Sequence, residues 1–377
     1  MYYDEFEHLA AKFVSAAAVA VPEQLVSLLI ASPLSARSSD LCMLWHPNYR
    51  KKHKGKLLLE TLFSVGTACL KGLIRLTGKY KQFGYALYGR MEDALLVLHF
   101  NCAFEASDGQ YRTPYVSTET GDAIFIFGPY DRCGKNAQKI EELLLMSKIS
   151  FLWILIGSGI RAFRKVDGNF YSKTLLLLKL LSWALSFRWL YDYYLQKVLS
   201  ETIETYNIRK LACVHEMHYY SRVVWRVASK YNVISYAVQH AAVTEGKRWF
   251  FHYPEEHNAG LVTPGLMYVF NKKMVEMFKP YYRNTDLKLG CSYRYARLKD
   301  IEASPNNKGR YYLFVSALPK FDNHVLINML CSLSGSGISV PVRFRFHPAA
   351  SISLKDRCLI RSCVKKGLVD VSRDTPL

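Results

Sequence analysis

Short apolar runs alternate with amphipathic segments along residues 210–295, and this rhythm constrains the fold more than any other feature of the chain. Lys210–Glu216 and Val233–Val243 are predicted to be strands, and Ser221–Asn232 between them is predicted to be a helix. PGLMYVFNKKMVEMFKPYYRN then predicts a strand followed by a helix, and LKLGCSYRY predicts a strand followed by a loop. Strands separated by single helices form mostly parallel sheets, so the sequence predicts an α/β protein.

The same rhythm returns near the end of the sequence. RYYLFVSAL predicts a strand, Phe321–Leu333 a helix and VPVRFRF a second strand, followed by a helix and a last strand at Val369–Ser372. Three strands amount to about half of a doubly wound nucleotide-binding domain. We therefore expect residues 309–377 to form a Rossmann-type domain that is incomplete.

These two α/β regions lead to a three-part organisation. Residues 1–92 are expected to form a helical, basic N-terminal region. The first α/β domain is expected over residues 93–300; it begins with DALLVLHFNCAFEA and is interrupted by long apolar helices at 137–200. EASPNNKG has the composition of a linker and precedes the partial domain at 309–377.

The charge of the chain indicates an anionic partner. The 377 residues include 50 Lys and Arg against 31 Asp and Glu, a net charge of +19. Nucleic acid is not expected as the partner, because the sequence has no zinc-finger spacing, RNP-like strand or basic zipper. A phosphate-rich donor molecule, an anionic lipid and an acidic polysaccharide remain.

A basic block at Arg50–Lys56 directly precedes a long apolar segment that also carries Lys71, Arg75, Lys79 and Lys81. Basic residues beside an apolar helical face suit the surface of an anionic membrane, where each contributes about 1 kcal/mol. The alternative is a solvated basic face on an ordinary helix. If the first alternative holds, the block anchors the chain to the inner membrane.

Two further apolar segments are too short to span a bilayer. Ile149–Ile160 is uncharged but falls well below roughly 20 residues, and Thr174–Phe187 carries Lys179 in its middle. We expect buried helices here, with membrane-dipping helices as the alternative. Asp4, Glu5 and Glu7 replace the basic start of a signal peptide, so we expect a cytoplasmic protein that is peripheral on the inner membrane.

Metal and disulfide chemistry are not expected. The nine cysteines are scattered without a CxxC pair, which argues against a disulfide framework and a structural zinc site. DxD, HExxH, GxSxG and Walker A motifs are absent as well. No metal and no cofactor are therefore predicted.

A His-Pro pair follows the strand VPVRFRF, at the kind of place where doubly wound sheets bind ligands. There His347 could donate a ring N–H to a phosphate, Pro348 would stiffen the turn, and Arg343 and Arg345 would add positive charge. The alternative for His347 is a histidine that caps a loop. Ser316 completes the residues expected to bind the donor.

Four motifs give the chain a resemblance to a known family. They are ASDGQYRTPYV at Ala106–Val116, YAVQHAAV at Tyr236–Val243, LKLGCSYRY at Leu287–Tyr295 and the His-Pro at His347. In this order they resemble bacterial capsule and lipopolysaccharide glycosyltransferases of the two-domain GT-B fold, the sialyltransferase-like and Kdo-transferase-like group. A closer match within it is to the type of protein encoded beside polysialic acid capsule genes. Ala241 stands where the family usually has glycine, and we expect the serine-containing loop that helps to hold the nucleotide in this family to be absent.

The resemblance implies a GT-B-like protein with two Rossmann-type domains that transfers sialic acid or a related acidic sugar from a CMP donor. Its acceptor would be a glycan or a polyprenyl-linked glycan, and other capsule biosynthesis proteins would be partners. Such a reaction needs a base for the acceptor hydroxyl. The candidate bases are Asp108, Glu216, His240 and Glu245, with an Asp-Gly turn as the alternative for Asp108, a helix cap for Glu216 and a core hydrogen bond for His240. A non-catalytic scaffold of a capsule assembly complex is the alternative for the whole chain.

Overall fold

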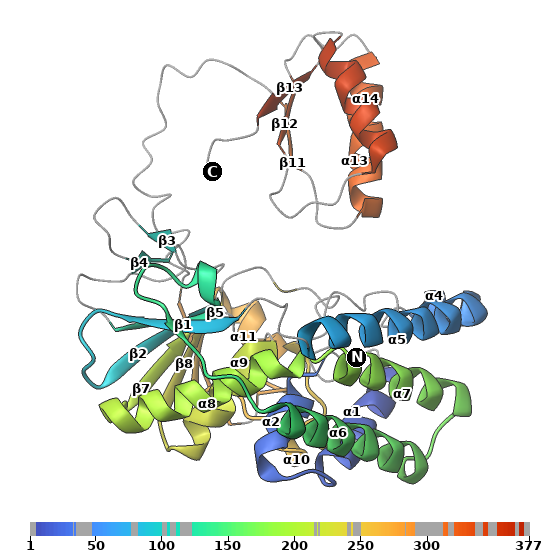
Figure 1. Ribbon diagram of the computed structural model, residues 1–377. Helices are drawn as coiled ribbons and strands as arrows, with labels where there is room; N and C mark the ends of the chain where they lie inside the picture. The colour runs from blue at the N-terminus through green and yellow to red at the C-terminus, as the bar shows by residue number, and fades with distance from the viewer. Residues whose placement is uncertain are drawn as a thin grey trace. The chain divides into compact units, whose positions relative to one another are not determined.

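The computed structural model describes the chain except for residues 1–4, 33, 35–46, 77–81, 100–103, 106–110, 114–122, 215–216, 218, 240–242, 244–249, 283, 291–311, 316–319, 336–341, 346–352, 366–368 and 373–377. The chain forms two compact units, residues 1–300 and 301–377. The N-terminal helices and the main sheet belong to the same unit. Figure 1 shows the elements of both units.

An eight-stranded sheet forms the centre of the first unit. Its order is β10 (Asp286–Leu289), β9 (Leu266–Val269), β8 (Ile234–Val238), β7 (Lys210–Cys213), β2 (Ala94–His99), β5 (Ile124–Pro129), β1 (Phe83–Tyr88) and β6 (Gln138–Lys139). The six strands from β10 to β5 run parallel to their neighbours. β1 and β6 extend the sheet in antiparallel pairing. A separate two-stranded sheet pairs β3 (Phe104–Glu105) with β4 (Tyr111–Arg112).

Alternation along the central strands divides the core between the two faces of the sheet. Leu95 and Val97 of β2 join the large core beneath the helices, whereas Leu96 and Leu98 belong to a small second cluster on the other face. Successive side chains of a strand point to opposite faces, and both sets here are apolar, as in buried parallel sheets. The helices therefore lie mainly over one face.

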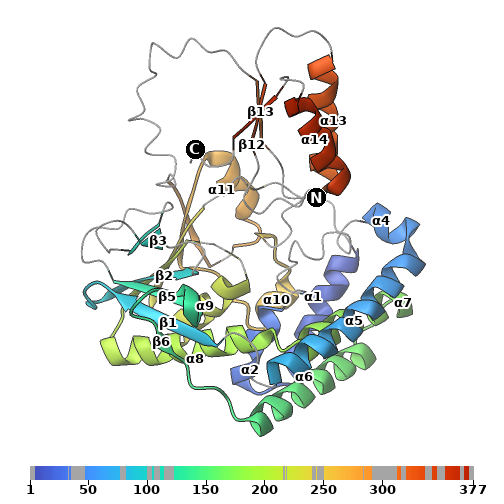
Figure 2. The same ribbon diagram turned by 45° about the horizontal axis from the view of Figure 1, so that its top comes forward.

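Ten α-helices are described in this unit, together with the 3₁₀ turn Tyr130–Arg132. α8 packs against α9, and both helices contribute side chains to the large core over the sheet. α1 and α2 contribute to that core as well. Farther out, α7 packs against both α5 and α6, so that these three helices lie side by side (Figures 1 and 2). The helices are α1 (Glu5–Ala18), α2 (Glu23–Ile30), α4 (Pro47–Lys52), α5 (Lys54–Leu76), α6 (Leu145–Lys165), α7 (Phe170–Leu185), α8 (Trp189–Tyr206), α9 (Tyr219–Lys230), α10 (Pro254–Asn258) and α11 (Lys272–Phe278).

The second unit is a three-stranded parallel sheet in the order β11 (Tyr312–Val315), β12 (Val342–Arg345) and β13 (Val369–Ser372). α13 (Lys320–Gly335) and α14 (Leu354–Lys365) connect the strands and pack against each other. Val342 and Phe344 of β12 join the core with residues of both helices. Arg343 and Arg345 alternate with them and therefore lie on the face away from the helices.

The α/β fold and the helical N-terminal region expected from the sequence are confirmed. β7, α9, β8, β9, α11 and β10 lie where the pattern of 210–295 predicts them, and β11, α13, β12, α14 and β13 follow the pattern of 309–377. β1 falls inside the segment 1–92 that we expected to be helical, because FGYALY pairs antiparallel with β5. The expected burial of Ile149–Ile160 is wrong for one side of α6, where Trp153 is 66% exposed.

Candidate functional site

The sheet reverses its strand order between β2 and β7. From β7 the chain adds β8, β9 and β10 on one side, while β5 lies on the other side of β2. β2 and β7 are parallel, so their carboxyl ends meet at one edge. Open α/β sheets bind their ligands outside the carboxyl ends of the strands at such a reversal. This edge is the candidate functional site.

His99 is the last residue of β2 and lies among aromatic rings. Its ring centroid is 5.4 Å from that of Tyr220 in α9 and 6.0 Å from that of Tyr191 in α8. Tyr191 also packs edge-on against Phe127 of β5, at 4.8 Å between centroids. Burial lowers the pKa of His99 to about 4. The imidazole is therefore neutral at physiological pH, so one ring nitrogen can donate a hydrogen bond and the other can accept one.

β7 ends at Cys213, and the next helix along the chain is α9. Cys213, the last residue of the strand, lies 3.8 Å from the hydroxyl of Ser221, measured from sulfur to oxygen, and both side chains are buried. Val214 and Met217 are buried as well. These two residues thus contribute apolar side chains to the core beside the strand end.

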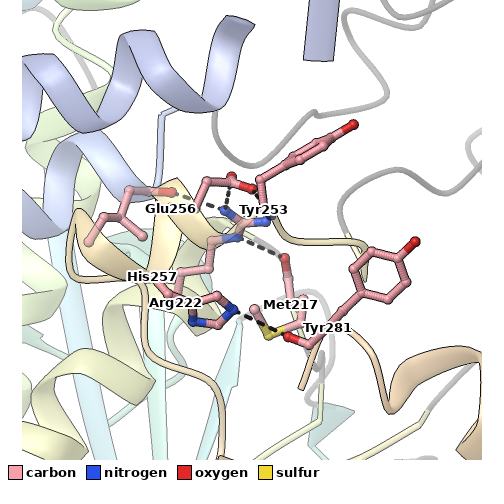
Figure 3. A network of polar contacts seen from close by, with 7 residues as sticks. Met217, Arg222, Tyr253, Glu256, His257 and Tyr281 are labelled. Atoms are coloured by element: carbon pink, nitrogen blue, oxygen red, sulfur yellow. Dashed lines mark hydrogen bonds and ion pairs between the residues drawn. The ribbon is translucent and has the colours of Figure 1, made fainter. Parts of the chain in front are cut away.

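A buried arginine, Arg222, holds the backbone at Met217 (Figure 3). Arg222 of α9 donates from Nε to the carbonyl of Met217 at 3.4 Å and from Nη1 to the carbonyl of Ile30 at 3.4 Å. Nη1 also lies 3.8 Å from Oε1 of Glu256, and neither side chain exposes more than 1% of its surface. A buried charge needs a partner of this kind, because an unpaired one is strongly unfavourable.

Glu256 has a second role at the start of α10. Its Oε2 accepts the backbone N–H of Tyr253, the N-cap residue of the helix, at 2.9 Å, as the third helical residue does in a capping box. The hydroxyl of Tyr253 donates to Glu7 of α1 at 3.5 Å, and His8 of α1 lies 2.6 Å from Glu255. One polar network therefore connects the N-terminal helix with the loop that follows β7.

Gln239, which directly follows β8, connects β8 with β9. Its side chain is fully buried, and its Oε1 accepts the backbone N–H of Phe270 at 3.0 Å. Its own backbone N–H donates to the carbonyl of Tyr268 at 2.9 Å. Through these two hydrogen bonds Gln239 extends the pairing of β8 with β9 past the end of β8.

Most site residues predicted from the sequence lie outside the described residues: Asp108, Glu216, His240, Glu245, Ser316, His347 and Pro348. Glu216 follows β7 closely in the sequence, and His240 follows β8. Since β7 and β8 are neighbouring parallel strands, the two strand ends that precede Glu216 and His240 lie at one edge. Arg343 and Arg345 are described, and both lie on the face of β12 that is turned away from α13 and α14.

A carboxylate occupies the start of α14, the helix that follows β12. Ser353 accepts the backbone N–H of Asp356 at 3.1 Å and donates its hydroxyl to Oδ2 of Asp356 at 2.6 Å. His324 of α13 lies 2.8 Å from Oδ1. The hydrogen bonds from Ser353 and then from His324 lower the pKa of Asp356. A phosphate bound at this helix end would therefore meet a negative charge.

Sequence reasoning missed His99, Arg222 and Glu256. A signal existed for Arg222 alone, since it is a charged residue inside the buried stretch YSRVVW of α9. Its partner Glu256 lies far away in the sequence, within PEEHN, where acidic residues at a helix start are ordinary. Pairing of this kind is not visible without the fold.

Among the described residues, no group of three or more His, Cys, Asp and Glu side chains is placed to hold a metal ion. The candidate site is instead a set of strand ends, a buried arginine and a neutral histidine. No family model, no curated protein and no solved structure matches the chain.

Proposed function

We propose that the chain is a glycosyltransferase of bacterial capsule or surface polysaccharide synthesis. It transfers an acidic sugar, sialic acid or a relative, from a CMP donor to a glycan or polyprenyl-linked acceptor. The main support is the strand reversal between β2 and β7, because Glu216 and His240 follow the adjacent strands β7 and β8 in the sequence. The chain has two α/β units, one with a mostly parallel sheet and one with a parallel sheet, and a net charge of +19; both features agree with a phosphate-bearing donor.

The proposed roles follow from the chemistry of the residues. Glu216 or His240 takes the proton from the acceptor hydroxyl, with Asp108 as the third candidate. His347, Arg343 and Arg345 stabilise the departing nucleotide phosphate, with Pro348 and Ser316 beside them. The acceptor side is the first unit and the donor side is the second, as the resemblance to the GT-B group implies. The protein works at the cytoplasmic face of the inner membrane together with other capsule biosynthesis proteins.

A non-catalytic scaffold of the same fold is the second candidate. The carboxylate of Asp356 at the start of α14 favours it, because this charge opposes a phosphate at that helix end. Ala241 favours it as well, since the resembled family usually has glycine at this position. In this alternative the chain binds its partners without turning over a sugar nucleotide.

Binding of CMP and of a CMP-sugar to the full chain separates the two candidates. For the transferase we expect calorimetry to detect both ligands, and His347→Ala to weaken them by about 1.5–3 kcal/mol, the range for hydrogen bonds to charged groups. His46→Ala removes the histidine of the chain's other His-Pro pair and should leave binding unchanged. Transfer of labelled sugar to membranes, lost in Glu216→Gln or His240→Ala, completes the test. A wild-type chain that binds neither ligand contradicts the transferase.

A further inference from the structure

One side of α5 exposes a row of large apolar side chains, interrupted at Gly66. Phe63 is 74% exposed and Leu70 is 62% exposed, and they recur on one side of the helix with Leu59, Leu62 and Leu73. The row extends over four turns. Soluble surfaces rarely present apolar side chains in so long a row without a binding role.

The opposite side of α5 is already occupied. Leu57, Thr61, Ala68 and Gly72 are buried, and α5 packs against α7. The contact is very close at Gly72, where an added Cβ would lie 2.1 Å from the carbonyl oxygen of Leu185. The helix is thus fixed to the protein by its inner side and cannot bury its outer side by rotating.

α6 repeats the arrangement. Met146, Trp153 and Ile160 are exposed at intervals of two turns, whereas Leu155, Ser158, Gly159 and Ala162 are buried. The helix packs against α1 and α7. α7 packs against both α5 and α6, so the two helices that carry the exposed rows belong to one group of packed helices (Figure 2). We name Leu59, Leu62, Phe63, Leu70, Leu73, Met146, Trp153 and Ile160 the outer apolar surface.

The exposed charges within α5 and α6 are mostly positive. The exposed charges of α6 are Arg161, Arg164 and Lys165, and the helix has no acidic residue; α5 has Glu60 as its single acidic residue against four basic ones. Lys51 and Lys52 at the end of α4 and Lys54 and Lys56 at the start of α5 are exposed. Apolar rows bordered by cations match the boundary between anionic headgroups and acyl chains.

We propose that the outer apolar surface inserts into one leaflet of an anionic membrane, with α5 and α6 lying parallel to the membrane plane. Both helices are long and apolar enough to cross a bilayer. Crossing would separate them from α7 and expose their inner polar groups to lipid, among them Lys148, whose ammonium group bonds to Glu142 at 2.7 Å. In-plane insertion keeps every inner contact. The proposal does not depend on whether the chain transfers a sugar.

Sedimentation of the full chain with vesicles tests the insertion. We expect binding to phosphatidylcholine vesicles that contain phosphatidylglycerol and much weaker binding to phosphatidylcholine alone. Phe63→Ser and Leu70→Ser should each weaken binding by about tenfold, because each removes one inserted side chain. Leu354→Ser changes a side chain of α14 that is 82% exposed and serves as the matched control. Equal binding of wild type and both α5 variants would overturn the proposal.

Trp153 reports the depth, because it lies near the middle of α6. An in-plane helix places it near the headgroups, so lipids brominated at the top of the acyl chain should quench its fluorescence most. A spanning helix would place it at the bilayer centre, and lipids brominated near the chain end would then quench most. Trp153→Phe identifies the signal among the six tryptophans. Strongest quenching by the deep bromines would overturn the in-plane arrangement.

A second copy of the chain is the rival occupant of the outer apolar surface. Light scattering of the purified protein without lipid distinguishes it. A monomer that binds vesicles supports membrane insertion. A dimer that Phe63→Ser converts to a monomer, in a protein that ignores vesicles, would overturn it in favour of a protein interface.

Discussion

At the scale of single residues, Arg222 and Glu256 connect the site with the N-terminal helices. Both charges are withdrawn from water, and each also bonds to backbone groups, the carbonyls of Met217 and Ile30 for Arg222 and the N–H of Tyr253 for Glu256. Replacing a whole buried pair with apolar residues is often tolerated, whereas removing one member leaves an uncompensated charge. The pair therefore serves the site mainly by holding Met217 and the start of α10 in place.

Glu256→Gln should lower the free energy of unfolding by about 3–5 kcal/mol, because it leaves Arg222 buried without its counter-charge. Urea unfolding followed by circular dichroism measures the loss. Glu23→Gln is the matched control. It breaks the ion pair of Glu23 with Arg226, which lies on α9 like Arg222, and the side chain of Glu23 is 81% exposed. Because the Glu23 carboxylate is mostly in water, its ion pair contributes little, so this variant should unfold like the wild type.

His99 should make the protein sensitive to acid. Its folded pKa of about 4 lies below the ordinary value, so the unfolded chain binds a proton more readily than the folded chain. Stability should consequently fall as the pH decreases from about 6.5 toward 4. His99→Gln, which cannot titrate, should lose less stability over this window. Urea unfolding at several pH values gives both slopes, and identical slopes would show that another group dominates.

At the scale of elements, the two glycines of α5 that differ most in surroundings test how the helix is held. An added Cβ at Gly72 meets the Leu185 carbonyl, whereas at Gly66 it meets nothing within 4 Å. Gly72→Ala should therefore destabilise the protein by about 1–3 kcal/mol through overpacking. Gly66→Ala should stabilise it by up to about 1 kcal/mol, because alanine favours the helix. Thermal unfolding of both variants measures these changes in stability. Equal changes in the two variants would contradict the close packing of α5 on α7.

The sequence predicted the elements better than their partners. Periodicity located β7, α9, β8 and β13, since each has a local pattern of apolar residues. β1 was not foreseen because its pairing with β5 depends on residues far along the chain. The exposed side of α6 was wrongly expected to be buried, since an apolar row looks the same whether it faces a core or a membrane. For the site, strand ends could be predicted, but the Arg222–Glu256 pair could not, because only the fold brings the two together.

At the scale of the whole molecule, each unit has a core of its own. The core of the second unit is small and centres on Ile327, Leu330, Val342, Phe344, Ile360 and Cys363. That of the first unit contains far more residues, with Trp225 among them. Small cores provide little stability. We infer that the second unit is the less stable of the two.

Scanning calorimetry of the full chain should accordingly resolve two transitions, with that of the second unit at lower temperature. Phe344→Ala should destabilise the second unit by about 3–5 kcal/mol, because it empties the centre of a small core. Trp225→Ala should shift the other transition by a similar free energy. A single transition that moves in both variants would show that the units unfold together.

The neighbouring positions of β2 and β7 also set the order of events during synthesis. β2 can pair with β5 early, but its other edge stays open until α6, α7, α8 and finally β7 have been made. At ribosomal rates this interval lasts on the order of ten seconds. During it, an unpaired central strand and the apolar rows of α5 and α6 are exposed on the same nascent chain. The nascent chain that still lacks β7 is therefore the most aggregation-prone form of this protein. Contact with a membrane or a chaperone at that stage would protect it until β7 pairs with β2.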